Sequence, residues 1–344
     1  MICVGFYPQF CELRIKLFNF VVGKGVALGN APKLKGEEMS IFSNKKADLQ
    51  RECAKQIAKL DDWHRRQLMS NICFDRIELK QEFLTEKYHT TESWNETLYF
   101  MLLRSLDIKA NRHLYERLAK ILPYSILLKC SLDQTAVQAM LLGCAGLLPR
   151  LMIMYKDCVE VRQLVDIFEF NAHKYGLETI GFNEWNLFAR MGDNHPVVRL
   201  LQLASLISNH DHLLDNMLDC CSRLDVERLF CSTSLPGWAS RFLSDDNPEG
   251  AITRNKAYMM GINVVAQMQI LYSEYTLRSD LDSRGNELLE NLPAENNSYI
   301  ARWAKLGIKC ANALESQALL QLSKEYCSRG NCDHCPLSRF MEGV

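Results

Sequence analysis

Apolar side chains recur at helical spacing from about Ala47 to the last residue, and this periodicity limits the fold more than any other feature. Between Asp75 and Lys87 the charges alternate with residues such as Ile77, Leu79 and Leu84, which places most of the apolar groups on one helical stripe. Strand patterns are nearly absent, and no helix pair repeats at a constant length. The sequence therefore predicts an all-α fold, built as an irregular antiparallel multi-helix array rather than a regular solenoid.

Several helices carry recognisable boundaries. Ser93 followed by Glu96 predicts a capping box at the start of a helix whose buried face includes Trp94, Leu98 and Leu102. Further helices are expected over Asn111 to Leu122, Asp133 to Leu148, Lys156 to Tyr175, Pro196 to Ile207, Asp211 to Cys221, Asp225 to Phe230, Lys256 to Leu277, Glu287 to Leu292, Asn297 to Leu306 and Ala313 to Cys327.

The first 45 residues differ in character from the rest. They contain the glycine-rich run Val21 to Asn30, but Lys24, Lys33 and Lys35 are not followed by Ser or Thr, as the lysine of a phosphate-binding loop would be. We interpret residues 1–45 as a divergent or loosely ordered extension. Residues 46–344 are then one helical domain that ends in a cysteine-rich loop.

The composition excludes some classes of protein. The 40 basic and 41 acidic residues give a net charge of -1, so the overall field does not favour nucleic acid or an acidic membrane. No apolar run reaches the roughly 18 to 20 residues of a membrane span. Several of the 14 cysteines, such as Cys73, Cys144 and Cys220, fall within apolar helical patterns, which indicates free thiols and a cytoplasmic location.

Three cysteines near the end of the chain are the strongest candidates for chemistry. Cys327, Cys332 and Cys335 follow the spacing Cys-x4-Cys-x2-Cys, and together with His334 they are the predicted metal ligands. A structural zinc site takes four ligands. Because His334 is adjacent to Cys335, its side chain should point away from the centre of the site, and Cys310 would lie roughly 20 Å from Cys327 along a helix. Water or a partner's side chain could supply the fourth ligand.

Three interpretations of this cluster stay open. The first is a zinc site, and the second is free or disulfide-capable thiols without metal. The third is an iron-sulfur cluster, because Cys-x2-Cys-Pro near the C-terminus resembles the cluster loop of helix-hairpin-helix DNA glycosylases. That loop has a longer first spacing and a fourth cysteine where this chain has Met341, which makes the third interpretation the weakest.

No motif for covalent catalysis is present. The chain has no Gly-x-Ser-x-Gly, and none of its eight histidines stands beside a nucleophile in the sequence. The sequence therefore favours a protein that is not an enzyme.

Read in order, several segments resemble a family of bacterial proteins of unknown function, DUF2851. The resemblance spans about Glu52 to Leu337, and it rests on Ser93 to Tyr99, Gln138 to Leu147, Asn194 to Leu200, Glu290 to Asn296 and Ser316 to Leu322, followed by the cysteine loop. Fuller members of the family have an N-terminal part with a Gly-Asp-Val-Glu-Ile-His motif, reminiscent of nuclease-like folds, which this chain lacks. The resemblance implies a shortened member that holds the helical part, and it carries no established activity.

The leading functional hypothesis is a helical interaction module for a protein partner, with the terminal cysteines as a structural clasp or zinc site. The alternative is a nucleic-acid-binding or processing factor, in which a metal or iron-sulfur loop lies next to Lys324, Arg329 and Arg339. A third hypothesis is a redox-sensing thiol pair, Cys332 and Cys335.

Overall fold

The structure is a computed structural model that describes residues 50–107, 109–187 and 192–342. The chain divides into two units, Met1–Asp48 and Leu49–Val344. The predicted N-terminal extension lies outside the described residues, and the described fold is that of the second unit.

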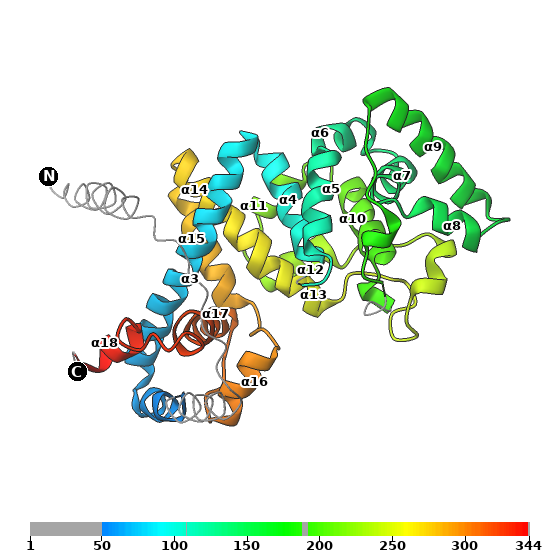
Figure 1. Cartoon of the computed structure of the whole chain (residues 1–344). Coiled ribbons are helices and arrows are strands. Elements are labelled where there is room, and N and C mark those ends of the chain that lie inside the picture. Colours follow the sequence, from blue (N-terminus) through cyan, green and yellow to red (C-terminus); the bar gives the residue numbers. More distant parts are fainter. Residues whose placement is uncertain (1–49, 108, 188–191, 343–344) are drawn as a thin grey trace, which may run out of the picture. The chain divides into compact units, whose positions relative to one another are not determined.

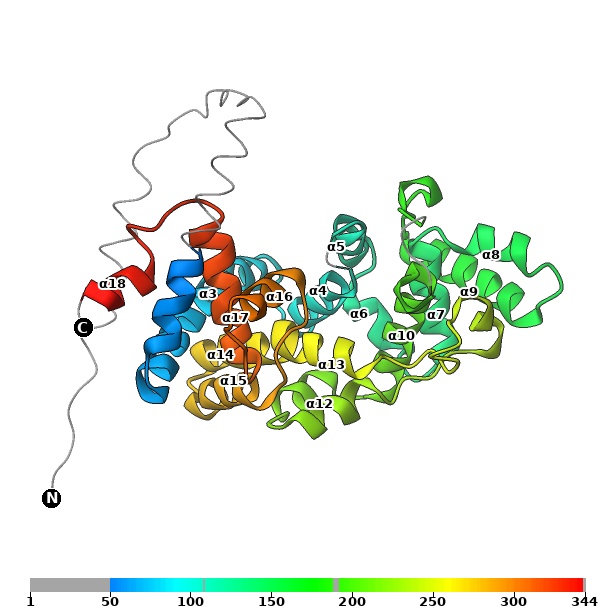
Figure 2. The same cartoon turned by 90° about the horizontal axis from the view of Figure 1, so that it is seen from below.

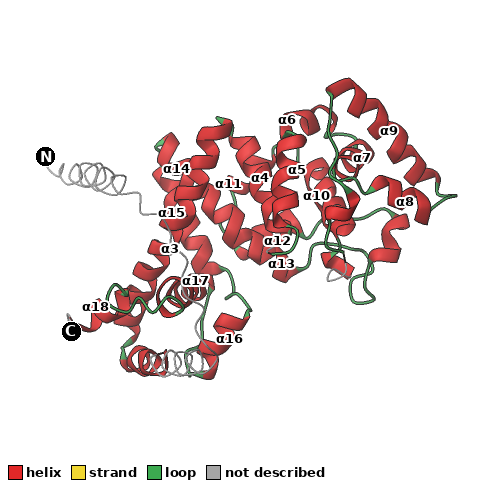
Figure 3. Cartoon of the chain, viewed as in Figure 1, coloured by secondary structure: helices red, strands yellow, loops and turns green. Residues whose placement is uncertain are grey.

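Every regular element of the described residues is helical, which confirms the all-α prediction (Figure 3). After a helical stretch at residues 50–59, the first half contains α3 (Asp62–Thr91), α4 (Trp94–Leu106), α5 (Arg112–Ile121), α6 (Tyr124–Leu127), η1 (Leu128–Cys130), α7 (Gln134–Cys144), α8 (Leu148–Met154), α9 (Val159–Tyr175), η2 (Phe182–Glu184) and η3 (Gly192–Asn194). The second half contains α10 (Pro196–Asn209), α11 (Leu213–Leu218), α12 (Arg223–Phe230), η4 (Gly237–Phe242), α13 (Arg254–Met260), η5 (Gly261–Val265), α14 (Ala266–Thr276), α15 (Ser279–Asn291), α16 (Ser298–Lys305), α17 (Ala313–Gln321), η6 (Leu322–Cys327) and α18 (Pro336–Glu342).

Polar side chains begin many of these helices by accepting hydrogen bonds from free backbone amides. Asp61 caps α3 through the amides of Trp63 and His64, at 3.0 and 2.9 Å. Asn297 and Asn312 cap α16 and α17 in the same way. The short polar side chains between apolar runs therefore set where the helices start.

Only one of the two hydrogen bonds of the predicted capping box at Ser93 forms. Ser93 Oγ accepts from the Glu96 amide at 3.4 Å, but the Glu96 carboxylate accepts from the amides of Tyr124 and Ser125, both at 2.9 Å. The carboxylate thus caps α6, because the neighbouring helix start offers two free amides where Ser93 offers one.

Helix α3 is longer than predicted, and its apolar stripe is divided. Ile77 and Leu84 are buried, whereas Leu79 is 47% exposed. Phe83, also on the outer side, lies under the guanidinium of Arg104, 4.1 Å from the ring centre. The buried side faces α17 and the η5–α14 region, so tertiary packing decides which apolar residues enter the core.

Segments that are distant in the sequence pack together at this end of the unit. Helix α17 (red) lies against α3 (blue) in both views (Figures 1 and 2), and α18 also contacts α3. Helices α14 and α15 pack closely at Gly285, where an added Cβ would lie 3.0 Å from the Ala266 carbonyl oxygen and 2.8 Å from Ile270. Because glycine has no Cβ, the backbones of α14 and α15 can approach each other closely at Gly285.

A second set of contacts brings α7 against α9 and α10, and α4 against α5. The buried apolar residues of both regions belong to one core cluster, which includes Leu102, Leu141, Leu200 and Trp303. Among the described residues, no single helix has the length and hydropathy of a membrane span. Helices α7 and α8 together reach that length and hydropathy, but they are bent by 106° relative to each other.

Candidate functional site

The predicted metal ligands lie at the end of η6, a π-helical turn that continues α17, and in the segment that follows it. Cys327 is the last residue of η6, and Gly330 then turns the chain with a φ of 68°, as the sequence predicted. The Cys335 amide donates to the Cys332 carbonyl at 3.0 Å, which closes a tight turn just before Pro336 begins α18. Cys327 therefore ends η6, and Cys332 and Cys335 lie on the turn between η6 and α18.

Their burial differs. Cys335 is 6% exposed and belongs to the core, Cys327 and Cys332 are partly exposed, and His334 is exposed. Within the described part of the chain, no three His, Cys, Asp or Glu side chains stand at the spacing of ligands around one metal ion. The metal site at Cys327, Cys332, Cys335 and His334 thus stays a prediction.

A fourth cysteine, which the sequence reasoning missed, lies near this loop. Burial raises the pKa of the Cys53 thiol to about 11, and the charges of Cys335 and Cys332 raise it further. Burial raises the pKa of Cys327 to about 12, with added effects from Cys53, Cys335 and Cys332. Such mutual effects require the thiols to lie near one another. Cys53 precedes Cys327 by about 270 residues, so no local spacing could have indicated it.

Cys310, the candidate that sequence reasoning did weigh, lies in other surroundings. Burial raises the pKa of its thiol to about 12, followed by the effect of Glu315, and Arg65 opposes the rise. None of the loop cysteines contributes to this shift, and the expectation that Cys310 is a poor fourth ligand stays a prediction.

The basic residues near the loop have partners within the protein. The Arg329 guanidinium pairs with Glu325 at 2.7 Å, and the Lys324 ammonium lies 5.6 Å from the centre of the Tyr299 ring. Arg339 is close enough to Asp75 to lower the pKa of that carboxyl, although burial raises it overall. Two of the three charges that suggested nucleic-acid binding are therefore engaged in intramolecular contacts.

A polar network lies between α3, η5 and α17. Lys80 Nζ donates to Gln317 Oε1 at 2.9 Å and to Asn263 Oδ1 at 3.1 Å, and Arg76 Nε donates to the same Gln317 oxygen at 2.7 Å. Gln317 Nε2 donates to Glu295 at 2.5 Å. Burial lowers the pKa of Lys80 to about 7, and Arg76 lowers it further while Glu295 opposes the shift. The network joins three elements that are distant in sequence.

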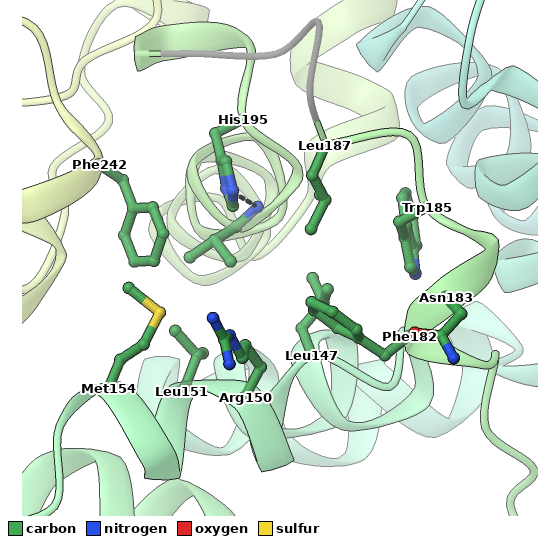
Figure 4. A pocket seen from close by; sticks show the side chains of 11 residues that line it. Leu147, Arg150, Leu151, Met154, Phe182, Asn183, Trp185, Leu187, His195 and Phe242 are labelled. Carbon is green, nitrogen blue, oxygen red and sulfur yellow. Dashed lines mark hydrogen bonds between the residues drawn. The ribbon is translucent and has the colours of Figure 1, made fainter.

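A pocket of about 530 Å³ lies between α8, α10, η2 and η4 (Figure 4). Its lining is mostly apolar and aromatic, with a guanidinium, an amide and an imidazole as its polar groups besides the indole N–H of a tryptophan. It comprises Leu147, Arg150, Leu151, Met154, Phe182, Asn183, Trp185, Leu187, His195, Val197 and Phe242. We call it the His195 pocket. Its volume and lining are typical of binding sites for small molecules or single side chains.

His195 has a structural task at the edge of this pocket. Its Nδ1 accepts from the Val197 amide at 3.2 Å, which caps α10, and its ring lies 4.6 Å from the ring of Phe242. Burial lowers the pKa of His195 to about 4, so the imidazole is neutral at physiological pH. No sequence pattern indicated this role, because histidine is an uncommon helix cap.

The fold and these sites define an all-helical protein with an apolar pocket and a separate cysteine-containing segment. A comparison with protein families finds a match over residues 33–298 to the family described as a protein of unknown function, DUF2851. The chain belongs to this family, as the resemblance implied. The match ends before the cysteine loop, although the resemblance was expected to reach Leu337. No curated protein and no solved structure matches the chain.

Proposed function

We propose that this protein is a helical interaction module that binds a peptide segment of a protein partner in the His195 pocket. The observation that carries the proposal is the lining of this pocket, which combines apolar walls with very few polar groups. An aromatic or aliphatic side chain entering it would lose contact with water, which is the main source of affinity at anchor positions.

The polar groups of the pocket favour binding over catalysis. The Nδ1 lone pair of His195 is occupied by the Val197 amide, and its low pKa makes the ring a poor proton acceptor near neutral pH. The other ionisable side chain of the lining is Arg150. A guanidinium stays protonated and serves to bind anions, so the lining lacks a pair suited to acid-base chemistry.

Arg150 also indicates which peptides fit. It is exposed, on the same helix as Leu151 and Met154, and its side chain lies beside theirs at the pocket (Figure 4). A peptide with an apolar anchor next to Asp or Glu would fill the pocket and pair its carboxylate with the guanidinium. The described cysteines are free thiols, which supports a partner in a reducing compartment such as the cytoplasm.

The test is a fluorescence anisotropy panel of labelled peptides, with Leu, Phe or Met anchors next to either Asp or Lys. The Met154→Trp variant places bulk in the pocket. The matched control is Ile153→Trp, on the same helix at a position that is 59% exposed. We expect acidic peptides to bind, Met154→Trp to weaken them at least tenfold, and Ile153→Trp to leave them unchanged.

Reversing the charge with Arg150→Glu should shift the preference toward the Lys peptides. Far-UV circular dichroism verifies that each variant is folded. Equal binding by Met154→Trp and the wild type, or no binding by any peptide of the panel, would show that the pocket is not an anchor site.

A further inference from the structure

We propose that Arg76 and Lys80 bind a phosphate group at the polar network between α3, η5 and α17. The group is free phosphate or the phosphate of a small organic ester, and the site would recognise either one through the same oxygen atoms. This inference is independent of the His195 pocket, because no residue of the network lines that pocket.

Two positive side chains meet at one oxygen atom in this network. Arg76 and Lys80 lie one turn apart on α3, and Arg76 Nε and Lys80 Nζ donate to the same Gln317 Oε1, at 2.7 and 2.9 Å. Lys80 Nζ also donates to Asn263 Oδ1 at 3.1 Å. Like charges four residues apart on a helix repel each other, and here a shared acceptor holds them together. Positive charge is therefore concentrated at this point.

No carboxylate of the described residues pairs directly with either cation. The contacts of Arg76 and Lys80 are with neutral amide oxygens. The carboxylate of the network, Glu295, accepts from Gln317 Nε2 at 2.5 Å and from Asn297 Nδ2 at 3.1 Å. Both cations are half-buried, and buried Lys and Arg side chains are usually paired with an acid. Two cations thus face one indirect carboxylate, which leaves a surplus of positive charge.

The cations also keep donors free for a ligand. A guanidinium has five N–H groups, and Arg76 uses only the one on Nε in the described contacts. Its two terminal nitrogens are not among the buried atoms that lack a partner, so solvent reaches them. Lys80 uses two of its three N–H groups. The free edge of a guanidinium binds two phosphate oxygens at once, and an ammonium adds a compact charge beside them.

The protonation of Lys80 should change when the anion binds. Burial lowers the pKa of Lys80 to about 7, and the charge of Arg76 lowers it further. Glu295 and Cys73 oppose this shift, while Lys324 adds to it. The group that η5 contributes is a neutral amide. A phosphate dianion would favour the charged ammonium, so at pH 8, where most free molecules hold an uncharged Lys80, binding should take up about one proton.

The experiment is isothermal titration calorimetry of the full chain at pH 8, with sodium phosphate and glycerol phosphate as the probes. Sodium chloride at the same ionic strength is the reference. Each titration is done in Tris and in HEPES, because the difference in enthalpy between two buffers gives the number of protons taken up. We expect one site per chain and uptake of about one proton. Tighter binding of glycerol phosphate would identify an ester as the source, and equal or weaker binding would identify free phosphate.

Sulfate tests the role of Lys80 by its dependence on pH. It keeps its charge between pH 7 and pH 9, so any change in its affinity comes from the protein. As Lys80 loses its proton over this range, the affinity for sulfate should fall about tenfold. In Lys80→Met the affinity should be lower at pH 7 and should change less with pH.

A pair of variants tests the guanidinium. Arg76→Gln should weaken phosphate binding at least tenfold. The matched control is Arg66→Gln, at an exposed position of the same helix, and it should bind as the wild type does. Circular dichroism verifies that each variant is folded. The proton uptake of the wild type needs no variant, so it tests the site even if Arg76→Gln fails to fold.

Three results would overturn the proposal. They are no phosphate binding beyond the chloride reference at up to about 10 mM, equal binding by the wild type and Arg76→Gln, and binding without proton uptake at pH 8. None of these results bears on the peptide panel for the His195 pocket, so the two proposals can fail separately.

Discussion

Lys80 gives the fold a dependence on pH that can be calculated. Its ammonium is held between α3, η5 and α17, and its pKa is about 7 when folded, against about 10.5 for a free lysine. Between these two values the unfolded chain binds one proton more than the folded chain does. Stability must therefore rise with pH in this window, by at most about 1.4 kcal/mol per pH unit.

Replacing Lys80 with Met removes the titrating group and keeps most of the volume. Between pH 7 and pH 9 the free energy of unfolding of the wild type should increase by about 2 kcal/mol relative to that of Lys80→Met. Below pH 7 the difference between the two proteins should level off, because both the folded and the unfolded wild type are then protonated.

The assay is urea unfolding followed by circular dichroism at pH 6, 7, 8 and 9. Subtracting the variant from the wild type cancels the titration of the cysteines, which act in the opposite direction at high pH. Lys305→Met, at an exposed position of α16, is the control and should follow the wild type. Parallel curves for the wild type and Lys80→Met would refute the reasoning, since Lys80 would then stay charged in the folded protein.

Two further predictions concern stability. Gly146→Ala should lower the free energy of unfolding by more than about 2 kcal/mol, because the residue has a φ of 68° and its Cβ would lie 1.9 Å from a backbone carbonyl oxygen. Gly176→Ala is the matched control, with a φ of 62° and open space around the Cβ. It should lower the free energy of unfolding by only about 1 kcal/mol in the same urea assay. Ser323→Ala should lower the melting temperature, because the indole N–H of the fully buried Trp303 donates to Ser323 Oγ at 2.8 Å. Leaving this donor unpaired should lower the free energy of unfolding by about 1 to 3 kcal/mol. An unchanged melting temperature would show that the indole finds another acceptor.

The sequence predicted local features more accurately than distant ones. The helical class, the turn at Gly330 and the helical run that ends at Cys327 all follow from residues near one another in the chain. The predicted helix over 256–277 corresponds to α13, η5 and α14, but the π turn within it had no signal in the apolar pattern. Periodicity describes which side is buried and is insensitive to one extra residue in a turn.

Features that depend on tertiary contacts were missed for a physical reason. Lys80 reads as part of a charged helix face, and only the approach of η5 and α17 surrounds it with acceptors. In the sequence nothing distinguishes Cys53 from the other cysteines, because Cys332 and Cys335 affect its thiol only in the folded chain. The His195 pocket combines side chains from four elements, none of which carries a motif.

The packing of α17 on α3 has a consequence during synthesis. About 220 residues separate the end of α3 from the start of α17, and a ribosome adding 5 to 20 residues per second needs roughly 10 to 45 s to make them. For this time the apolar side of α3 has been made but its covering helix has not. In a newly made chain, the side of α3 that packs on α17 therefore lacks its native cover until the final helices are made.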